Sequence, residues 1–172
     1  MLDWLEPMPA TPFHFGPGLL VKAVAPRQFS LAAYSVAQVV IDLESGYHLL
    51  RGDYPVHRQA HTFFMGGLIG LVCGLIVSRV GRWWARPRDL IPEGLAAEYR
   101  MPMAVWSGVF GGLFHSLLDG IMHADVRPLR PFSDANPLYG LTSDAVLYLF
   151  CTITGLVGAA LLLAWERRAR RF

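Results

Sequence analysis

Three long apolar blocks constrain this chain more than any other feature, because each is about as long as a bilayer is thick. The blocks are TFFMGGLIGLVCGLIVSRV (62–80), MAVWSGVFGGLFHSLLDGIM (103–122) and AVLYLFCTITGLVGAALLLAW (145–165). Charged residues make up only 16% of the 172-residue chain, against roughly 25% in soluble domains. We therefore predict an all-α, polytopic membrane helical bundle that forms a single integral-membrane domain over residues 1–172.

Two weaker segments precede these blocks. SLAAYSVAQVVIDLESGYHLL (30–50) is apolar at first and then turns acidic, whereas PFHFGPGLLVKAV (12–24) is too short for a full span. The shorter segment suits a half-span or re-entrant helix packed against protein. The sequence thus predicts four to five membrane helices, and we favour five. The N-terminus starts with acidic residues and lacks a basic region, so we expect no cleavable signal peptide.

Basic residues in short loops predict the orientation, because such loops stay in the cytoplasm. Lys22 and Arg27 flank the first connection, and arginines crowd the loop 79–101 and the tail after residue 165. These regions are predicted to lie inside, so the loops 49–56 and 123–143 face outward. The chain shows no sustained basic surface with nucleic-acid-binding motifs, so membrane lipids rather than nucleic acid are the expected surroundings.

Local signals suggest where helices start and pack. We expect a helix to begin near residue 54, with Asp53 as its N-cap and Pro55 in its first turn. Cys73 and Cys151 lie inside apolar blocks and are expected to be buried thiols rather than a disulfide or a zinc site. Glycines recur every four positions along two blocks, at Gly66, Gly70 and Gly74 and at Gly108 and Gly112. Such lines let membrane helices pack closely.

On this topology the histidines and many carboxylates gather on the outer side. His115 and Asp119 fall in the outer half of 103–122, and His123 extends the same stripe at the helix end. His57 and His61 are expected in the first turns of the helix that begins near residue 54. Their i, i+4 spacing lets two imidazoles share one ion. Ionisable groups at membrane depth indicate a functional site by default.

The first two segments bring further candidate ligands to the outer side. His14 lies near the outer surface, and Asp42, Glu44 and His48 lie toward the outer end of 30–50. Asp42 and Glu44 are two positions apart, so both face one site only if the helix ends there. Imidazole and carboxylate both ligate divalent metals, which predicts a metal site, with zinc as the favoured ion.

The order of five short motifs resembles a known family. TPFHFGPGLL, VIDLESG, HRQAHTFF, HSLLDGIMH and RPFSDANPL are similar, in that order, to motifs of the bacterial inner-membrane metal-dependent hydrolases of YdjM type. Those proteins show an early His in a short helix, a Pro-Asp-x-Asp motif, an HR-x-x-THS motif, an H-x-x-x-D helix and a later PFS. The resemblance runs from residue 11 to about residue 140.

This resemblance implies a metal site in the bacterial inner (cytoplasmic) membrane, open toward the periplasm. It implicates seven residues, namely His14, Asp42, Glu44, His57, His61, His115 and Asp119. The chain departs from the family pattern in two places. IDLE replaces the Pro-Asp-x-Asp motif, which leaves open whether Asp42 or Glu44 binds the metal. Phe63 stands where a Ser is common in the family. A weaker similarity to zinc phospholipase C and P1-type nucleases suggests phosphoester chemistry, and one to three ions are expected.

The sequence therefore predicts a membrane-embedded metal-dependent hydrolase that acts on a phosphoester or ester bond of a lipid or amphipathic substrate. The expected core ligands are His57, His61, His115 and Asp119. Four further candidates are His14, Asp42, Glu44 and His123. Each is expected to be a further ligand of the same ion, a ligand of a second metal or the general base. Asp42, Glu44 and Asp119 are the candidate catalytic carboxylates.

The loop 123–140 is expected to cover the site from outside. Its candidate substrate-binding residues, with one arginine from the preceding outer loop, are Arg58, Arg127, Arg130 and Ser133. Guanidinium groups bind phosphate bidentately, which suits a phosphorylated substrate.

Two other functions stay open at this stage. A non-enzymatic metal-binding or metal-transport protein predicts ligands in both halves of the membrane. A haem-binding subunit predicts histidine pairs on facing helices but gives no role to the carboxylates. The sequence leaves open the substrate, the identity and number of the metals, the roles of His48 and His123, and the oligomeric state.

Overall fold

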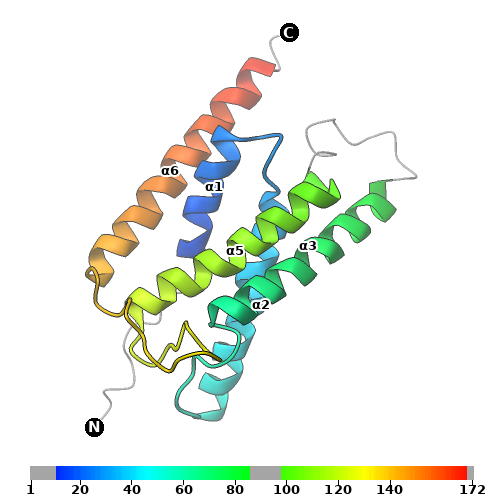
Figure 1. Cartoon of the computed structure of the whole chain (residues 1–172). Coiled ribbons are helices and arrows are strands. Elements are labelled where there is room, and N and C mark those ends of the chain that lie inside the picture. Colours follow the sequence, from blue (N-terminus) through cyan, green and yellow to red (C-terminus); the bar gives the residue numbers. More distant parts are fainter. Residues whose placement is uncertain (1–10, 86–97, 170–172) are drawn as a thin grey trace.

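The computed structural model describes residues 11–85 and 98–169, and every regular element in these ranges is helical (Figure 1). This confirms the predicted all-α class. A short 3-10 helix, η1 (Thr11–His14), leads into the first of five α-helices. They are α1 (Phe15–Val24), α2 (Leu31–Arg51), α3 (Phe63–Ala85), α5 (Met101–Met122) and α6 (Asp144–Ala169).

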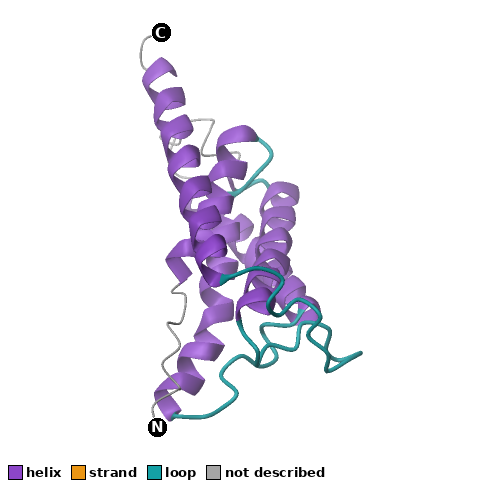
Figure 2. Ribbon diagram, turned by 90° about the vertical axis from the view of Figure 1, so that its left-hand side faces the viewer, coloured by secondary structure: helices purple, strands orange, loops and turns teal. Residues whose placement is uncertain are grey.

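Successive helices run in opposite directions, so the connections gather at two ends of the bundle (Figure 1). Residues 52–62 and 123–143 lie together at what we call the loop end, where most of the loop backbone collects (Figure 2). The opposite, basic end carries cationic side chains in the last turns of α1, α3 and α6 and before α5. These are Lys22, Arg82, Arg167, Arg168 and Arg100.

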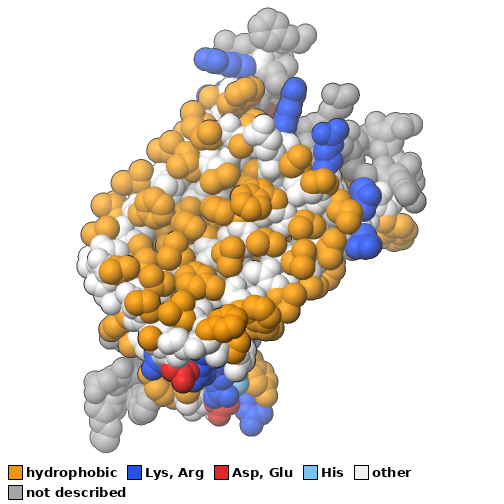
Figure 3. All heavy atoms as spheres, viewed as in Figure 1, with side chains coloured by type: hydrophobic (Ala, Val, Ile, Leu, Met, Phe, Trp, Pro, Cys, Tyr) orange, Lys and Arg blue, Asp and Glu red, His pale blue; other side chains and the backbone are white. Residues whose placement is uncertain are grey.

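Three helices are long and apolar enough to cross a membrane: Phe63–Trp84, Met101–Met122 and Asp144–Arg168. They correspond to the three apolar blocks of the sequence. Hydrophobic side chains cover the middle of the face shown in Figure 3, with charged side chains toward both ends. The helix α1 has only 10 residues, as expected for the short N-terminal helix, and α2 carries acidic residues in its second half. Insertion of these two helices in the membrane stays a prediction.

The predicted helix start near residue 54 is wrong. Residues 53–62 form a loop, and α3 begins only at Phe63, where Thr62 Oγ1 accepts a hydrogen bond from the Met65 N–H at 3.1 Å. Asp53 caps no helix there; its Oδ2 lies 3.2 Å from His48 Nδ1 at the end of α2. The physical reason is that N–H groups of this loop donate to carboxylates from other elements instead of joining a helix.

Glycines bring α3 and α5 into backbone contact. A Cβ atom added to Gly70 would lie 2.1 Å from the Gly108 carbonyl oxygen, and one on Gly112 would lie 1.9 Å from the Gly66 oxygen. The two glycine lines face one another, which gives the close helix packing that the sequence predicts. Because α5 packs on both α2 and α3, its polar residues are enclosed by protein rather than turned to the outside of the bundle.

Candidate metal centre

Four side chains converge inside the loop end of the bundle. Asp42 comes from α2, His61 from the loop before α3, and His115 and Asp119 from one face of α5; we call this group the primary site. His115 Nε2 lies 3.2 Å from Asp42 Oδ1 and 3.1 Å from Asp119 Oδ2. His61 Nε2 lies 3.7 Å and 3.4 Å from the same two oxygen atoms.

These distances fit the spacing of ligands around one ion. Zinc binds imidazole nitrogen and carboxylate oxygen at about 2.0–2.2 Å, so neighbouring ligand atoms of a tetrahedral site lie about 3.3–3.5 Å apart. The Nε2 atoms of His61 and His115 are fully buried and make no hydrogen bond. Buried polar atoms without a hydrogen bond are rare, and two such atoms facing two carboxylates point to a cation between them.

The His115 ring is oriented from its other nitrogen. His115 Nδ1 lies 2.6 Å from Gln38 Oε1, and the Gln38 amide is itself fixed because its Nε2 donates to the Gly111 carbonyl at 3.3 Å. The proton of His115 therefore sits on Nδ1, which leaves a lone pair on Nε2 for an ion. The only sequence signal for Gln38 is its position one turn before Asp42 on the same helix face.

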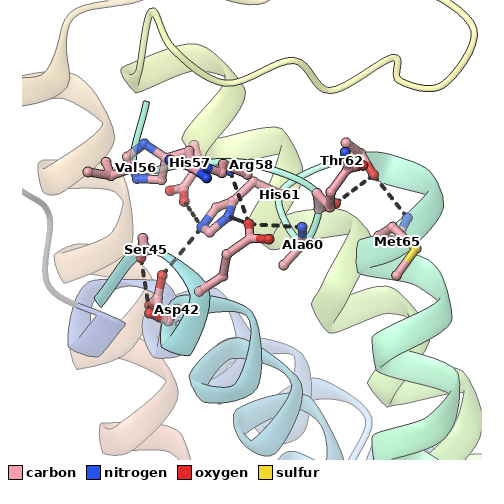
Figure 4. A network of polar contacts seen from close by, with 12 residues as sticks. Asp42, Ser45, Val56, His57, Arg58, Ala60, His61, Thr62 and Met65 are labelled. Atoms are coloured by element: carbon pink, nitrogen blue, oxygen red, sulfur yellow. Dashed lines mark hydrogen bonds and ion pairs between the residues drawn. The ribbon is translucent and has the colours of Figure 1, made fainter. Parts of the chain in front are cut away.

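Glu44 orients the second imidazole and shapes the loop around it. Its Oε2 lies 3.3 Å from His61 Nδ1 and accepts hydrogen bonds from the backbone N–H groups of Arg58 and Ala60 at 3.0 and 2.9 Å. Figure 4 shows His61 reaching from this loop toward Asp42. The structure thus places Asp42 beside the Nε2 atoms and Glu44 behind the ring.

Protonation of His61 competes with an ion. Burial lowers the pKa of His61, but the carboxylates of Asp42, Glu44 and Asp119 around the ring together outweigh this effect and raise it. The same carboxylates that stabilise a proton would stabilise a divalent cation, and metal binding releases the proton.

His57 lies outside the primary site, although the sequence suggests it as a core ligand. Its Nδ1 is 2.9 Å from Asp125 Oδ1, while the backbone N–H groups of Val56 and His57 donate to Asp125 Oδ2 at 3.1 and 3.2 Å. Burial raises the pKa of Asp125, yet the side-chain and backbone hydrogen bonds from His57, with the nearby imidazole charges, together lower it to about 2. Sequence reasoning missed Asp125, whose available signal is its place two residues after His123.

His57 and His123 stack on one another with ring centroids 4.3 Å apart, and His57 meets the His61 ring edge-on at 4.7 Å. His57, His123 and Asp125 thereby form a second group beside the primary site that can hold a metal ion. We call it the adjacent group. The predicted stripe on α5 thus divides, because His115 and Asp119 turn to one group and His123, at the helix end, turns to the other.

His14 joins the cluster from the N-terminal side. Its Nε2 lies 3.4 Å from Asp119 Oδ1, its Nδ1 lies 3.3 Å from His115 Nδ1, and the ring is 2% exposed. Tyr34 OH donates to the His14 carbonyl oxygen at 2.7 Å and fixes this turn. His14 Nε2 and Asp119 Oδ1 are both buried and make no hydrogen bond, as is also true of the Nε2 atoms of His61 and His115. His14 therefore stands beside the primary site as a further candidate ligand.

The remaining predicted residues lie at the loop end but contact their own segments. Arg58 Nε donates to the Pro55 oxygen at 2.9 Å, Arg127 Nη1 donates to the Ala124 oxygen at 2.6 Å, and Arg130 pairs with Asp134. Ser133 Oγ accepts a hydrogen bond from the Ala135 N–H at 3.1 Å. His48 stays apart from the cluster and pairs with Asp53. A role for the arginines and Ser133 in substrate binding stays a prediction.

The primary site is least enclosed on the α2 side. The side chains of Asp42 and Glu44 are each 21% exposed, whereas those of His61, His115 and Asp119 are at most 3% exposed. A small molecule would therefore approach past the two carboxylates of α2.

Comparison with known proteins found no matching family, no matching curated protein and no matching solved structure. The chain is therefore characterised by its own fold and site. It is an all-α protein with three helices that can span a membrane, by length and composition, and a buried His/Asp cluster that can hold a metal ion.

Proposed function

We propose that this protein is a membrane-embedded, zinc-dependent hydrolase that cleaves a phosphoester or ester bond of a lipid or amphipathic substrate. The observation that carries the proposal is the pair of buried Nε2 atoms, on His61 and His115, that face two carboxylates without making a hydrogen bond. The motif resemblance to the YdjM-type hydrolases supports the same class.

The residues of the primary site divide into those that hold the ion and those that support them. Asp42, His61, His115 and Asp119 would hold it, while Gln38 and Glu44 orient the two rings. A set of nitrogen and oxygen ligands without sulfur suits a catalytic zinc ion. Such an ion supplies a water of lowered pKa and polarises the bond to be cleaved.

The carboxylates have unequal access to a substrate. Asp119 is buried, so its role is to ligate the ion. Asp42 is partly exposed and lies beside the two Nε2 atoms, so it is the carboxylate placed to take the proton of an attacking water. Glu44 lies behind the His61 ring, where it supports the ligand.

The membrane position of the site follows from the charge distribution. With the basic end in the cytoplasm, the loop end faces the periplasm of a bacterial inner membrane, and the primary site lies near the level of lipid head groups. Arg58, Arg127 and Arg130 would then be close to the phosphate of a lipid substrate, which guanidinium groups bind well.

Metal transport is the weaker alternative. A transport path needs ligands along the membrane, yet α3, described as Phe63–Ala85, contains no His, Asp or Glu between the cluster and the basic end. In α5 the histidine and the acid both lie in the last eight residues, at the loop end. The ligands thus form a site on one side and not a path.

The test is hydrolysis of defined lipid analogues by the purified, zinc-loaded protein in detergent. Phosphodiester, phosphomonoester and carboxylester analogues are compared, with His115→Ala as the inactivated variant and His48→Ala as the matched histidine control. We expect turnover of at least one class that is lost in His115→Ala and kept in His48→Ala. Zinc-loaded protein that turns over none of the three, or activity that survives His115→Ala, would refute the proposal.

A further inference from the structure

The adjacent group offers the same kinds of ligand as the primary site, imidazole and carboxylate. In the primary site, Gln38 and Glu44 each accept at the Nδ1 atom of a histidine, which leaves Nε2 for an ion. In the adjacent group the carboxylate is itself a candidate ligand, because His57 Nδ1 and Asp125 Oδ1 lie 2.9 Å apart. These two atoms can face one ion once the proton between them is released.

The two groups are close neighbours. The rings of His57 and His61 are in edge-on contact at 4.7 Å, and the ring of His57 stacks on that of His123. Each residue of the adjacent group offers one ligand atom, and these atoms lie within 4.8 Å of one another. The side chain of Asp125 is 8% exposed and that of His57 is 5% exposed, so the group is not a solvated surface cluster.

We propose that His57, His123 and Asp125 hold a second divalent metal ion beside the primary site. The centre would then contain two neighbouring cations, one held by each group. Two adjacent cations suit the paired oxygens of a phosphoester in a displacement reaction, so within the proposed hydrolase function this inference favours phosphoester over carboxylester substrates. The second ion itself rests on the cluster geometry and does not require that the protein be a hydrolase.

Metal stoichiometry tests the second ion without any activity measurement. Metal-free protein is dialysed against buffered Zn²⁺, and bound zinc is quantified by mass spectrometry for the wild type and for two variants, His123→Ala and Asp125→Asn. Asp134→Asn, an exposed acid of the same loop, and His48→Ala are the matched controls. We expect about two ions per chain in the wild type and the controls, and about one in each of the two variants.

The ion that remains in His123→Ala and Asp125→Asn also shows that the variants are folded at the primary site. Saturation of the wild type at one ion, or two ions retained in both variants, would overturn the second site while leaving the primary site intact. Two ions without any hydrolysis would instead refute the proposed function and support this inference.

Discussion

At the scale of single residues, the orientation of each imidazole decides whether it can bind an ion. His115 and His61 are each held at Nδ1 by an oxygen, from Gln38 and Glu44, and this directs Nε2 inward. Such supporting groups commonly change metal affinity by about 10–100-fold when removed. The polar residues behind the ligands are therefore as open to test as the ligands themselves.

Replacing Gln38 by Leu should weaken zinc binding by about 10–100-fold without removing a ligand. The change deletes the acceptor of the His115 Nδ1–H, so the ring is no longer fixed in the tautomer that offers Nε2. Competition with a chromogenic chelator measures the affinity. Gln28→Leu, at an exposed position in the α1–α2 connection, is the control, and an unchanged affinity in Gln38→Leu would show that the support is unimportant.

Asp42 and Glu44 should respond differently to loss of charge. Asp42→Asn removes a candidate ligand and should abolish tight zinc binding at the primary site. Glu44→Gln removes only the group behind His61, so the ion should remain with an affinity lower by about 10–100-fold. Isothermal titration with zinc separates the two cases, and equal effects of both substitutions would contradict this division of roles.

Sequence spacing predicts part of this site and misses the supporting residues. His115 and Asp119 share a helix face, so their proximity follows from periodicity alone. Gln38 and Asp125 gain their roles only through tertiary contacts, with His115 and His57, across 77 and 68 positions of the chain. No local pattern marks an amide or a carboxylate as the partner of a distant imidazole.

At the scale of elements, the same limit explains the one helix boundary that the sequence misplaces. Apolar length predicts α3, α5 and α6 well, because a membrane helix is marked by composition over many residues. The loop 53–62 carries helix-start signals, but its backbone N–H groups donate hydrogen bonds to the carboxylates of Glu44 and Asp125. These hydrogen bonds take the place of those that a helix would form. His57 and His61 come together by this loop fold and not by helical spacing.

Gly70→Leu should destabilise the bundle by more than about 3 kcal/mol, near the upper end for single substitutions. A side chain at this position would meet the backbone of α5, since even a Cβ atom would lie 2.1 Å from the Gly108 oxygen. Gly46→Ala in α2 is the matched control, because its Cβ meets nothing within 4 Å, and a gain of about 0.5–1 kcal/mol is expected from helix propensity. Thermal unfolding in detergent compares them, and equal stability of the two variants would contradict close packing of α3 on α5.

At the scale of the whole molecule, the alternation of helix directions places both site loops at one end and most cationic helix ends at the other (Figure 1). The loop end also carries arginines. The predicted orientation therefore depends on which end of the bundle carries more basic residues. Substituted cysteines can test it, because the native Cys73 and Cys151 are both buried.

Ser133→Cys in intact bacterial cells should react with a membrane-impermeant maleimide, since residue 133 is exposed on the loop that we place in the periplasm. Gln28→Cys, exposed in the connection between α1 and α2, should react only after the cells are opened. The reverse pattern would invert the topology and move the site to the cytoplasmic side.

The central claim is that buried imidazoles and carboxylates at the loop end hold a metal ion, and X-ray absorption at the zinc edge tests it most directly. For zinc-loaded protein we predict a first shell of nitrogen and oxygen at about 2.0–2.1 Å, outer-shell scattering from imidazole and no sulfur at about 2.3 Å. His61→Ala combined with His115→Ala should lose the imidazole contribution of the primary site, so that imidazole scattering per protein chain falls, while His48→Ala keeps it. Absence of bound zinc, sulfur ligation, or an unchanged imidazole signal in the double variant would contradict the account.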